Sequence, residues 1–240
     1  MKHDPSSSNR SIVAENLHRV RDRIAEAAVA AGRSPDEVTL VGVSKYVDAA
    51  TTCLLADAGL PTLGEARPQQ LWDKASAPEL VDARIDWHLI GHLQRNKVRR
   101  TLPLVKLVHG VDSERLLRAI SDESSAAASA HRGPTRLLLE INISGDAHKH
   151  GFTPPQVEEL ISRFTQFPHV RLCGLMGMAA REGGVAVARQ NFAALRELRD
   201  QLLPGSELSM GMSGDFEAAI AEGSTIVRVG TALWEGMHHE

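Results

Sequence analysis

The chain has 240 residues, of which 42% are hydrophobic and 24% are charged, and its formal net charge is −3. This composition is typical of a folded globular protein and excludes a disordered or fibrous chain. The near-neutral charge favours neither nucleic acid nor an anionic membrane as a partner.

The first elements are an N-terminal tail and a helix. Residues 1–10 are polar and are predicted to form a flexible tail, which leaves residues 11–236 as one folded domain. From Ser11 to Ala31 apolar residues recur at helical spacing, so an N-terminal helix is predicted there. Eight short β-rich runs follow, at residues 38–44, 61–65, 86–92, 105–111, 136–144, 170–177, 207–213 and 225–231. Helix-like stretches separate them, for example at residues 113–130, 154–164 and 187–203.

The alternation of strands and helices predicts the fold. Most of the runs are almost continuously apolar, which is typical of parallel strands covered on both faces. Eight such strands with interleaved helices predict a single-domain (β/α)8 barrel, a TIM barrel, with an extra N-terminal helix. A doubly wound open sheet shows the same alternation, but the strand count and the lack of a glycine-rich turn after the first strand favour the barrel.

Three general properties bear on the surroundings of the protein. No apolar stretch resembles a signal peptide or reaches membrane-spanning length, so no membrane association is expected. The two cysteines, Cys53 and Cys173, lack metal-binding spacing; they suit a reducing compartment, although one long-range disulfide would be compatible with them. We therefore expect a cytoplasmic protein without a metal site.

Lys45 follows the first predicted strand, in the run "VGVSKYVDA". Reactive residues of such barrels lie at the C-terminal ends of strands. Alternation along a strand places Lys45 on the same face as Val43, and if that face is the barrel interior, partial desolvation would lower the pKa of the amine. An amine of that kind is nucleophilic toward an aldehyde. Taken alone, however, a lysine at a strand end is more often a solvent-exposed side chain.

The loops after the seventh and eighth strands carry glycine and hydroxyl residues, in "SMGMSGDFEAA" and "VRVGT". These loops are the usual phosphate site of the fold, where backbone N–H groups meet an anion. Gly230 allows close approach, and Ser213 and Thr231 add hydroxyl donors. Two ordinary turns are the alternative, but a phosphate site opposite an interior lysine is a more specific pairing than either feature alone.

A family resemblance adds to this interpretation. Six runs closely resemble successive motifs of the pyridoxal phosphate homeostasis proteins, which are relatives of the barrel domain of bacterial alanine racemase: "VGVSKYVDA", "LGEARPQQLWDK", "DWHLIGHLQRNK", "INISGDAHKHGF", "CGLMGMA" and "LSMGMSGDFEAAIAEGSTIVRVGTALW". The resemblance implies a monomer that holds pyridoxal 5′-phosphate (PLP) as a covalent aldimine, a Schiff base, on Lys45. The implied role is intracellular PLP (vitamin B6) and amino-acid homeostasis, with PLP-dependent apoenzymes as candidate recipients.

The resemblance also implies positions for the binding residues. Ser213, Gly230 and Thr231 would lie at the cofactor phosphate, and Arg228 near the pyridine nitrogen. The other implied or candidate cofactor-binding residues are Ser209, Met210, His88 and Asn142. Alternation turns Arg228 inward if its neighbours face the helices, and a salt bridge to Glu65 or Glu140 is the alternative.

His88 and His92 lie on one face of a strand, where packed or hydrogen-bonded histidines are commoner than ligands. The family usually carries asparagine where this chain has Ala66, so that amide is missing. The segment 146–151 resembles the family loop after the fifth strand and is a candidate cover for the site.

The alternative function is a PLP-dependent amino-acid racemase or decarboxylase. Two-base racemisation needs an acid or base on each face of the substrate. Alanine racemase takes its second base from a tyrosine of a partner subunit, whereas the only tyrosine here, Tyr46, is expected to point to the opposite side of the strand from Lys45. We therefore expect no robust enzyme activity, and at most a weak PLP-dependent side reaction.

Overall fold

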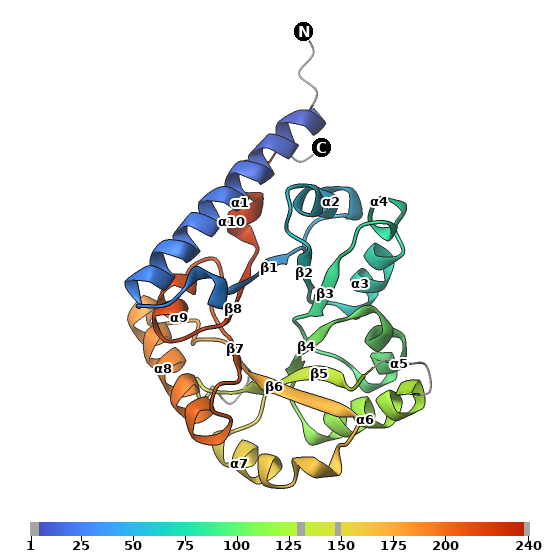
Figure 1. The fold of residues 1–240 in the computed structure, drawn as a ribbon, viewed down its shortest axis with the longest axis vertical. Coiled ribbons are helices and arrows are strands. Elements are labelled where there is room, and N and C mark those ends of the chain that lie inside the picture. Colours follow the sequence, from blue (N-terminus) through green and yellow to red (C-terminus); the bar gives the residue numbers. More distant parts are fainter. Residues whose placement is uncertain (1–4, 129–132, 147–149, 238–240) are drawn as a thin grey trace.

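Eight parallel strands close into a barrel in the order β1 to β8 in the computed structural model, which describes residues 5–128, 133–146 and 150–237 (Figure 1). Each strand pairs with the next one along the chain, and β8 pairs with β1. This closed arrangement confirms the (β/α)8 prediction and rules out the doubly wound open sheet.

The strands are β1 (Thr39–Val43), β2 (Thr62–Glu65), β3 (Asp86–Leu89), β4 (Leu107–Val111), β5 (Thr135–Ile141), β6 (Val170–Gly177), β7 (Glu207–Ser209) and β8 (Ile226–Val229). The α-helices are α1 (Pro5–Ala30), α2 (Ala49–Asp57), α3 (Pro68–Ala75), α4 (Pro78–Val81), α5 (Val98–Thr101), α6 (Glu114–Ala128), α7 (Pro154–Ser162), α8 (Gly184–Leu202), α9 (Phe216–Ala221) and α10 (Thr231–Trp234). Short 3-10 turns cover Pro35–Glu37, Arg95–Lys97, Leu102–Leu104 and Phe164–Gln166. Each predicted strand is therefore found, although several end earlier than the apolar pattern does.

Helix α1 lies outside the ring of alternating elements and packs against α9 and α10 (Figure 1). Its buried stripe includes Leu17, Val20 and Ile24, as the helical spacing predicts. Asn16 fixes its position by donating from Nδ2 to the carbonyl oxygens of Leu233, at 3.1 Å, and Glu235, at 2.8 Å. The helix begins at Pro5, so residues 5–10, predicted as tail, are helical, and residues 1–4 lie outside the described part.

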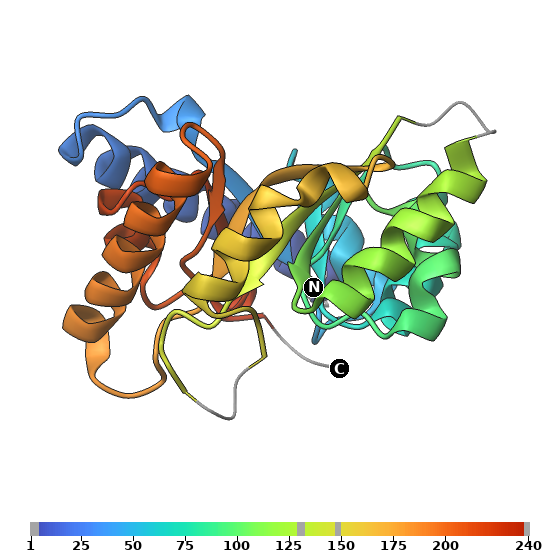
Figure 2. The same cartoon turned by 90° about the horizontal axis from the view of Figure 1, so that it is seen from below.

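The barrel wall separates two hydrophobic layers. Val41, Leu107, Leu138, Met176 and Ile226 form a small cluster inside the barrel. Most of the other buried apolar residues form one larger core, which includes the layer between the strands and the helices. Figure 2 shows the helices on both sides of the barrel, with the orange and red C-terminal helices beside the blue N-terminal one.

The strand β8 shows the alternation that places a charge inside the barrel. Val227 and Val229 belong to the larger outer core, whereas Ile226 belongs to the inner cluster. Because side chains alternate along a strand, Arg228 points inward with Ile226, as the sequence predicts. The charged Arg228 side chain therefore lies next to the inner apolar cluster.

Cys53 and Cys173 are both free thiols. No helix in the described ranges is both long enough and apolar enough to span a bilayer.

Candidate functional site

Lys45 lies in a turn at the C-terminal end of β1. The strand ends at Val43, and the turn is closed by the Val47 N–H, which donates to the Ser44 carbonyl oxygen at 3.1 Å. Strand alternation therefore does not extend to Lys45, which is half-buried at the barrel rim. Its Nζ lies 4.8 Å from the centroid of the Tyr46 ring, and Tyr46 is 84% exposed. The prediction that these two side chains point to opposite sides is wrong, because the chain has already left the strand.

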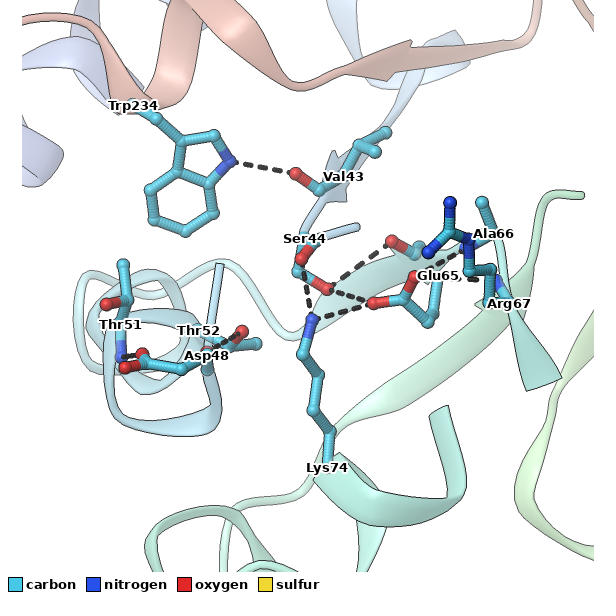
Figure 3. A network of polar contacts seen from close by, with 11 residues as sticks. Val43, Ser44, Asp48, Thr51, Thr52, Glu65, Ala66, Arg67, Lys74 and Trp234 are labelled. Atoms are coloured by element: carbon cyan, nitrogen blue, oxygen red, sulfur yellow. Dashed lines mark hydrogen bonds and ion pairs between the residues drawn. The ribbon is translucent and has the colours of Figure 1, made fainter. Parts of the chain in front are cut away.

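A second lysine holds the main chain just before Lys45 (Figure 3). Lys74 Nζ donates to the Ser44 carbonyl oxygen at 2.6 Å and to Glu65 Oε2 at 2.7 Å. The side chains of Lys74 and Glu65 are only 7% and 0% exposed, so this is a buried ion pair. Lys74 was not predicted from the sequence, although its place three residues after the buried Leu71, on the same face of α3, is a signal.

Trp234 joins the C-terminal end of the barrel to the same strand end. This residue closes α10, and its indole Nε1–H donates to the Val43 carbonyl oxygen at 2.8 Å (Figure 3). The bond spans most of the chain and brings the segment after β8 against the turn that carries Lys45. The sequence contains no local signal for this contact.

The loops after β7 and β8 lie against each other. Ser213 Oγ accepts hydrogen bonds from the Gly230 N–H at 3.2 Å and from the Ala232 N–H at 3.5 Å. Thr231 is exposed at the start of α10, next to these amides. Gly211, with φ at +95°, supplies the left-handed turn that lets the first loop leave β7. The two loops therefore meet, with Ser213 Oγ accepting the N–H groups of the loop after β8. Phosphate binding at this position stays a prediction.

Arg228 is buried inside the barrel and is held by three acceptor atoms. It donates to the Ser209 carbonyl oxygen at 2.9 Å, to Ser209 Oγ at 2.6 Å and to the Gly177 carbonyl oxygen at 3.2 Å. Burial lowers the pKa of the Arg228 guanidinium to about 10, while the Glu140 and Asp215 carboxylates act in the opposite direction. The guanidinium is therefore still charged at neutral pH.

The alternative role for Arg228, a salt bridge to a barrel carboxylate, is not found. Glu65 forms its ion pair with Lys74 instead. In the part of the chain that the structure describes, no ion pair joins Arg228 to Glu140. Glu140 lies inside the barrel, and burial, followed by the Asp112 charge, raises the pKa of its carboxyl group.

Two buried histidines extend the contacts of Ser209. His109 Nδ1 lies 2.9 Å from Ser209 Oγ, and His109 Nε2 lies 3.0 Å from His88 Nδ1. Burial lowers the pKa of His88 to about 4 and that of His109 well below its ordinary value. His88 is thus packed and hydrogen-bonded to His109, and a role for it beside a cofactor stays a prediction. His109 was missed, although a histidine within the apolar run 105–111 is itself a signal.

The Met210 side chain packs outside the barrel, unlike that of its neighbour Ser209. It is wholly buried in the larger core, among the residues that cover the outside of the barrel. Ser209 instead faces inward to Arg228. The Met210 side chain therefore does not join the polar residues inside the barrel.

Asn142 follows β5 and organises the loop after it. Its Nδ2 donates to the Asp146 carbonyl oxygen at 2.7 Å. The proposed cover, 146–151, is only partly described, since residues 147–149 lie outside the described residues. A role for Asn142 beside a cofactor stays a prediction.

His92 takes part in a separate cluster at the barrel mouth. Its Nδ1 lies 2.8 Å from Asp112 Oδ2, and its ring stacks on that of His150 with the centroids 5.4 Å apart. Among the described residues no group of three histidine, cysteine or acidic side chains is arranged to bind a metal ion.

The candidate site combines three kinds of group at the ends of neighbouring strands. Lys45 supplies an amine after β1, the loops after β7 and β8 supply N–H donors, and Arg228 supplies a buried cation. Such a set suits a small ligand that carries an electrophile, an anionic group and a hydrogen-bond acceptor.

Comparisons with known proteins identify relatives that match nearly the whole chain. Residues 11–237 match the family model of the alanine racemase N-terminal domain. The pyridoxal phosphate homeostasis protein of Pseudomonas aeruginosa is 41% identical over 225 residues, which cover 93% of this chain and 95% of the relative. The protein of the same name from Escherichia coli is 38% identical over 227 residues, which cover 92% and 95%.

Solved structures show the same likeness. PipY of Synechococcus elongatus, solved with PLP bound, has a TM-score of 0.78 and 32% identity, and the match covers 92% of this chain and 99% of that one. An alanine racemase from Acinetobacter baumannii, at 15% identity and a TM-score of 0.67, shares the fold, and the match covers 93% of this chain and 61% of the racemase. Since a relative at 41% identity and the family model both extend over nearly the whole chain, it belongs to the pyridoxal phosphate homeostasis proteins, a family built on the alanine racemase barrel.

Proposed function

We propose that this protein binds PLP at the C-terminal ends of β1, β7 and β8, with Lys45 forming the Schiff base. Its role would be to hold the cofactor for intracellular PLP (vitamin B6) and amino-acid homeostasis. The names of the relatives and the PLP-bound PipY structure support this proposal. PLP-dependent apoenzymes as recipients, a monomeric state and a cytoplasmic location stay predictions from the sequence.

The observation that carries the proposal is a contact between the segment after β8 and the C-terminal end of β1. Trp234 Nε1–H donates to the Val43 carbonyl oxygen, two residues before Lys45. Trp234 belongs to the helix that begins directly after Gly230, whose N–H already donates to Ser213 Oγ. The Lys45 amine and the hydroxyl and N–H groups that could bind an anion therefore lie at the same edge of the barrel.

Each group has a distinct part in binding. The Ser213 and Thr231 hydroxyls would donate hydrogen bonds to the phosphate, and the Gly230 N–H would donate to it in place of Ser213 Oγ. Arg228 carries only donors, so it would bind an unprotonated pyridine nitrogen and weaken the ring as an electron sink. The bound cofactor supplies an aldehyde that reacts reversibly with an amine, and Lys45 is the half-buried amine at the rim.

The site also supports the proposal that robust catalysis is absent. A two-base racemase needs acid or base groups on opposite faces of its substrate. The Tyr46 ring, from the only tyrosine of the chain, packs against the Lys45 amine, so it lies on the same side as that base. We expect purified protein with PLP to show no steady alanine racemisation; steady turnover lost on Lys45→Ala would overturn this part of the proposal.

Reductive trapping tests the binding site directly. The protein would be mixed with PLP, its visible absorption recorded, and the complex reduced with borohydride before peptide mapping. We expect a visible band and a label on Lys45, both lost in Lys45→Ala. Lys106→Ala is the matched control, because Lys106 lies just before β4, at the opposite end of the barrel. A label on Lys74, or no label at all, would refute the assignment.

A further inference from the structure

A continuous chain of hydrogen bonds runs through the barrel from Arg228 to His88. It passes through Ser209 Oγ, 2.6 Å from Arg228 Nη1, and through His109, whose two ring nitrogens lie 2.9 Å from Ser209 Oγ and 3.0 Å from His88 Nδ1. All four residues are buried, with exposed fractions of 8% or less. The four side chains come from β3, β4, β7 and β8.

We propose that His109 is a positioning residue for Arg228, acting through the Ser209 hydroxyl in a one-way chain in which His109 and His88 both carry their proton on Nε2. This inference goes beyond PLP binding, and only its consequence for the pyridine nitrogen depends on the proposed function. The direction of the chain follows from the donors and acceptors of its members.

Arg228 sets the first step because a guanidinium donates and never accepts. Its Nη1–H group occupies one lone pair of Ser209 Oγ. The hydroxyl proton of Ser209 is then free to donate, and in the described part of the chain the ring nitrogen of His109 is the acceptor within reach. A proton on His109 Nδ1 would leave the buried Ser209 hydroxyl without an acceptor, which native structures avoid.

The remaining steps follow from the first. With Nδ1 of His109 as an acceptor, the imidazole is neutral and its proton is on Nε2. That N–H faces His88 Nδ1, which must accept, so the proton of His88 is on Nε2 as well. The nearby guanidinium charge favours the same state, because it opposes protonation of His109.

The consequence for Arg228 is a fixed orientation. A serine hydroxyl rotates freely unless both its donor and its acceptor sides are occupied. Here the Ser209 hydroxyl donates to His109, so the Ser209 lone pairs face the guanidinium, and the Ser209 and Gly177 carbonyl oxygens accept two further Arg228 N–H groups. His109 thereby restricts the direction in which Arg228 can present its remaining N–H groups to a ligand.

The first test measures tautomers in the full-length protein without added cofactor. Long-range proton–nitrogen NMR correlations of nitrogen-15-labelled histidine would be recorded at pH 7, with His88→Asn and His109→Phe used to assign the two rings. We expect both rings to be neutral with the proton on Nε2. A proton on Nδ1 of His109, in a neutral or charged ring, would overturn the proposal.

The second test separates positioning from packing. The side-chain nitrogen signals of Arg228 would be compared in Ser209→Ala and in Ser206→Ala, the matched control, because the buried Ser206 hydroxyl has no hydrogen-bond partner in the described part. We expect separate, slowly exchanging Nη signals in the unaltered protein and the control, and averaged signals in Ser209→Ala and His109→Phe. Unchanged Arg228 signals in His109→Phe would refute the positioning role of His109, whatever Ser209→Ala shows.

Addition of PLP distinguishes this inference from the proposed function. We expect Ser209→Ala to alter the visible absorption band and Ser206→Ala to leave it unchanged. An identical band in the two variants would contradict the positioning of Arg228 at the ring. If the unaltered protein gives no band, the proposed function fails, while the tautomer and Arg228 measurements still decide the inference.

Discussion

Replacement of Lys74 by methionine tests the buried ion pair beneath the Lys45 turn. Methionine keeps the length and apolar stem of the side chain but removes the charge that pairs with Glu65 Oε2 at 2.7 Å. The Glu65 carboxylate is fully buried, so it would lose its cationic partner in a medium where an unpaired charge is costly. We expect Lys74→Met to lower the free energy of unfolding by about 3–5 kcal/mol.

The magnitude depends on burial, and the chain contains a matched control. Lys106 and Asp86 form an ion pair of similar length, 2.8 Å, but their side chains are 61% and 40% exposed. A solvated pair of this kind contributes about 0–1 kcal/mol, so Lys106→Met is expected to have little effect. Both variants would be compared by urea unfolding, with the slope of the transition checked for a change in exposed surface.

A double-mutant cycle completes this test. Lys74→Met combined with Glu65→Gln removes both charges, so the double variant should be destabilised by less than the sum of the single variants. Equal small losses for Lys74→Met and Lys106→Met would refute the argument that the pair is buried. A strictly additive cycle would show that Lys74 acts through Ser44 alone.

Two further predictions concern the histidine pair and the loop after β7. Burial lowers the pKa of His88 from 6.5 to about 4 on folding, so the unfolded chain binds more protons between these values. The free energy of unfolding should therefore fall by up to about 3 kcal/mol as the pH drops through that window. His88→Asn should flatten the pH dependence of the urea midpoint, and an unchanged pH dependence would contradict this prediction. Gly211→Ala should cost about 1–3 kcal/mol more than Gly59→Ala, since both have positive φ but only Gly211 would bring a Cβ to 2.6 Å from the Ala219 Cβ. Equal unfolding midpoints would show that the contact relaxes freely.

The barrel could be predicted because its signals are local. The apolar strand runs and the helical stretches between them are each visible within about ten residues, and closure follows from their number. The predicted boundaries were less accurate: α1 begins at Pro5, inside the predicted tail, and β1 ends at Val43 although the strand was predicted to reach Ser44. Helix ends and strand ends depend on hydrogen-bond partners elsewhere in the chain, which local composition does not reveal.

Site residues were predicted where their position follows from the order and direction of the strands. Lys45, Ser213 and Gly230 follow strands, so their position at the C-terminal edge of the barrel comes directly from strand order. His109 and Lys74 were missed because their roles depend on partners far away in the chain, such as Ser209 for His109. A periodic pattern reports which face a residue occupies, not which polar partner it meets there.

Two long-range contacts hold the turn at Lys45. Two consecutive carbonyl oxygens, those of Val43 and Ser44, accept side-chain hydrogen bonds from Trp234 at 2.8 Å and Lys74 at 2.6 Å. Strand-end carbonyls that leave a barrel need such partners, because buried polar groups without them are costly. With the preceding main chain fixed on both sides, the position of the Lys45 amine varies mainly through its own side chain. A fixed backbone keeps the amine in the same region of the rim, which is the pre-organisation that a binding site needs.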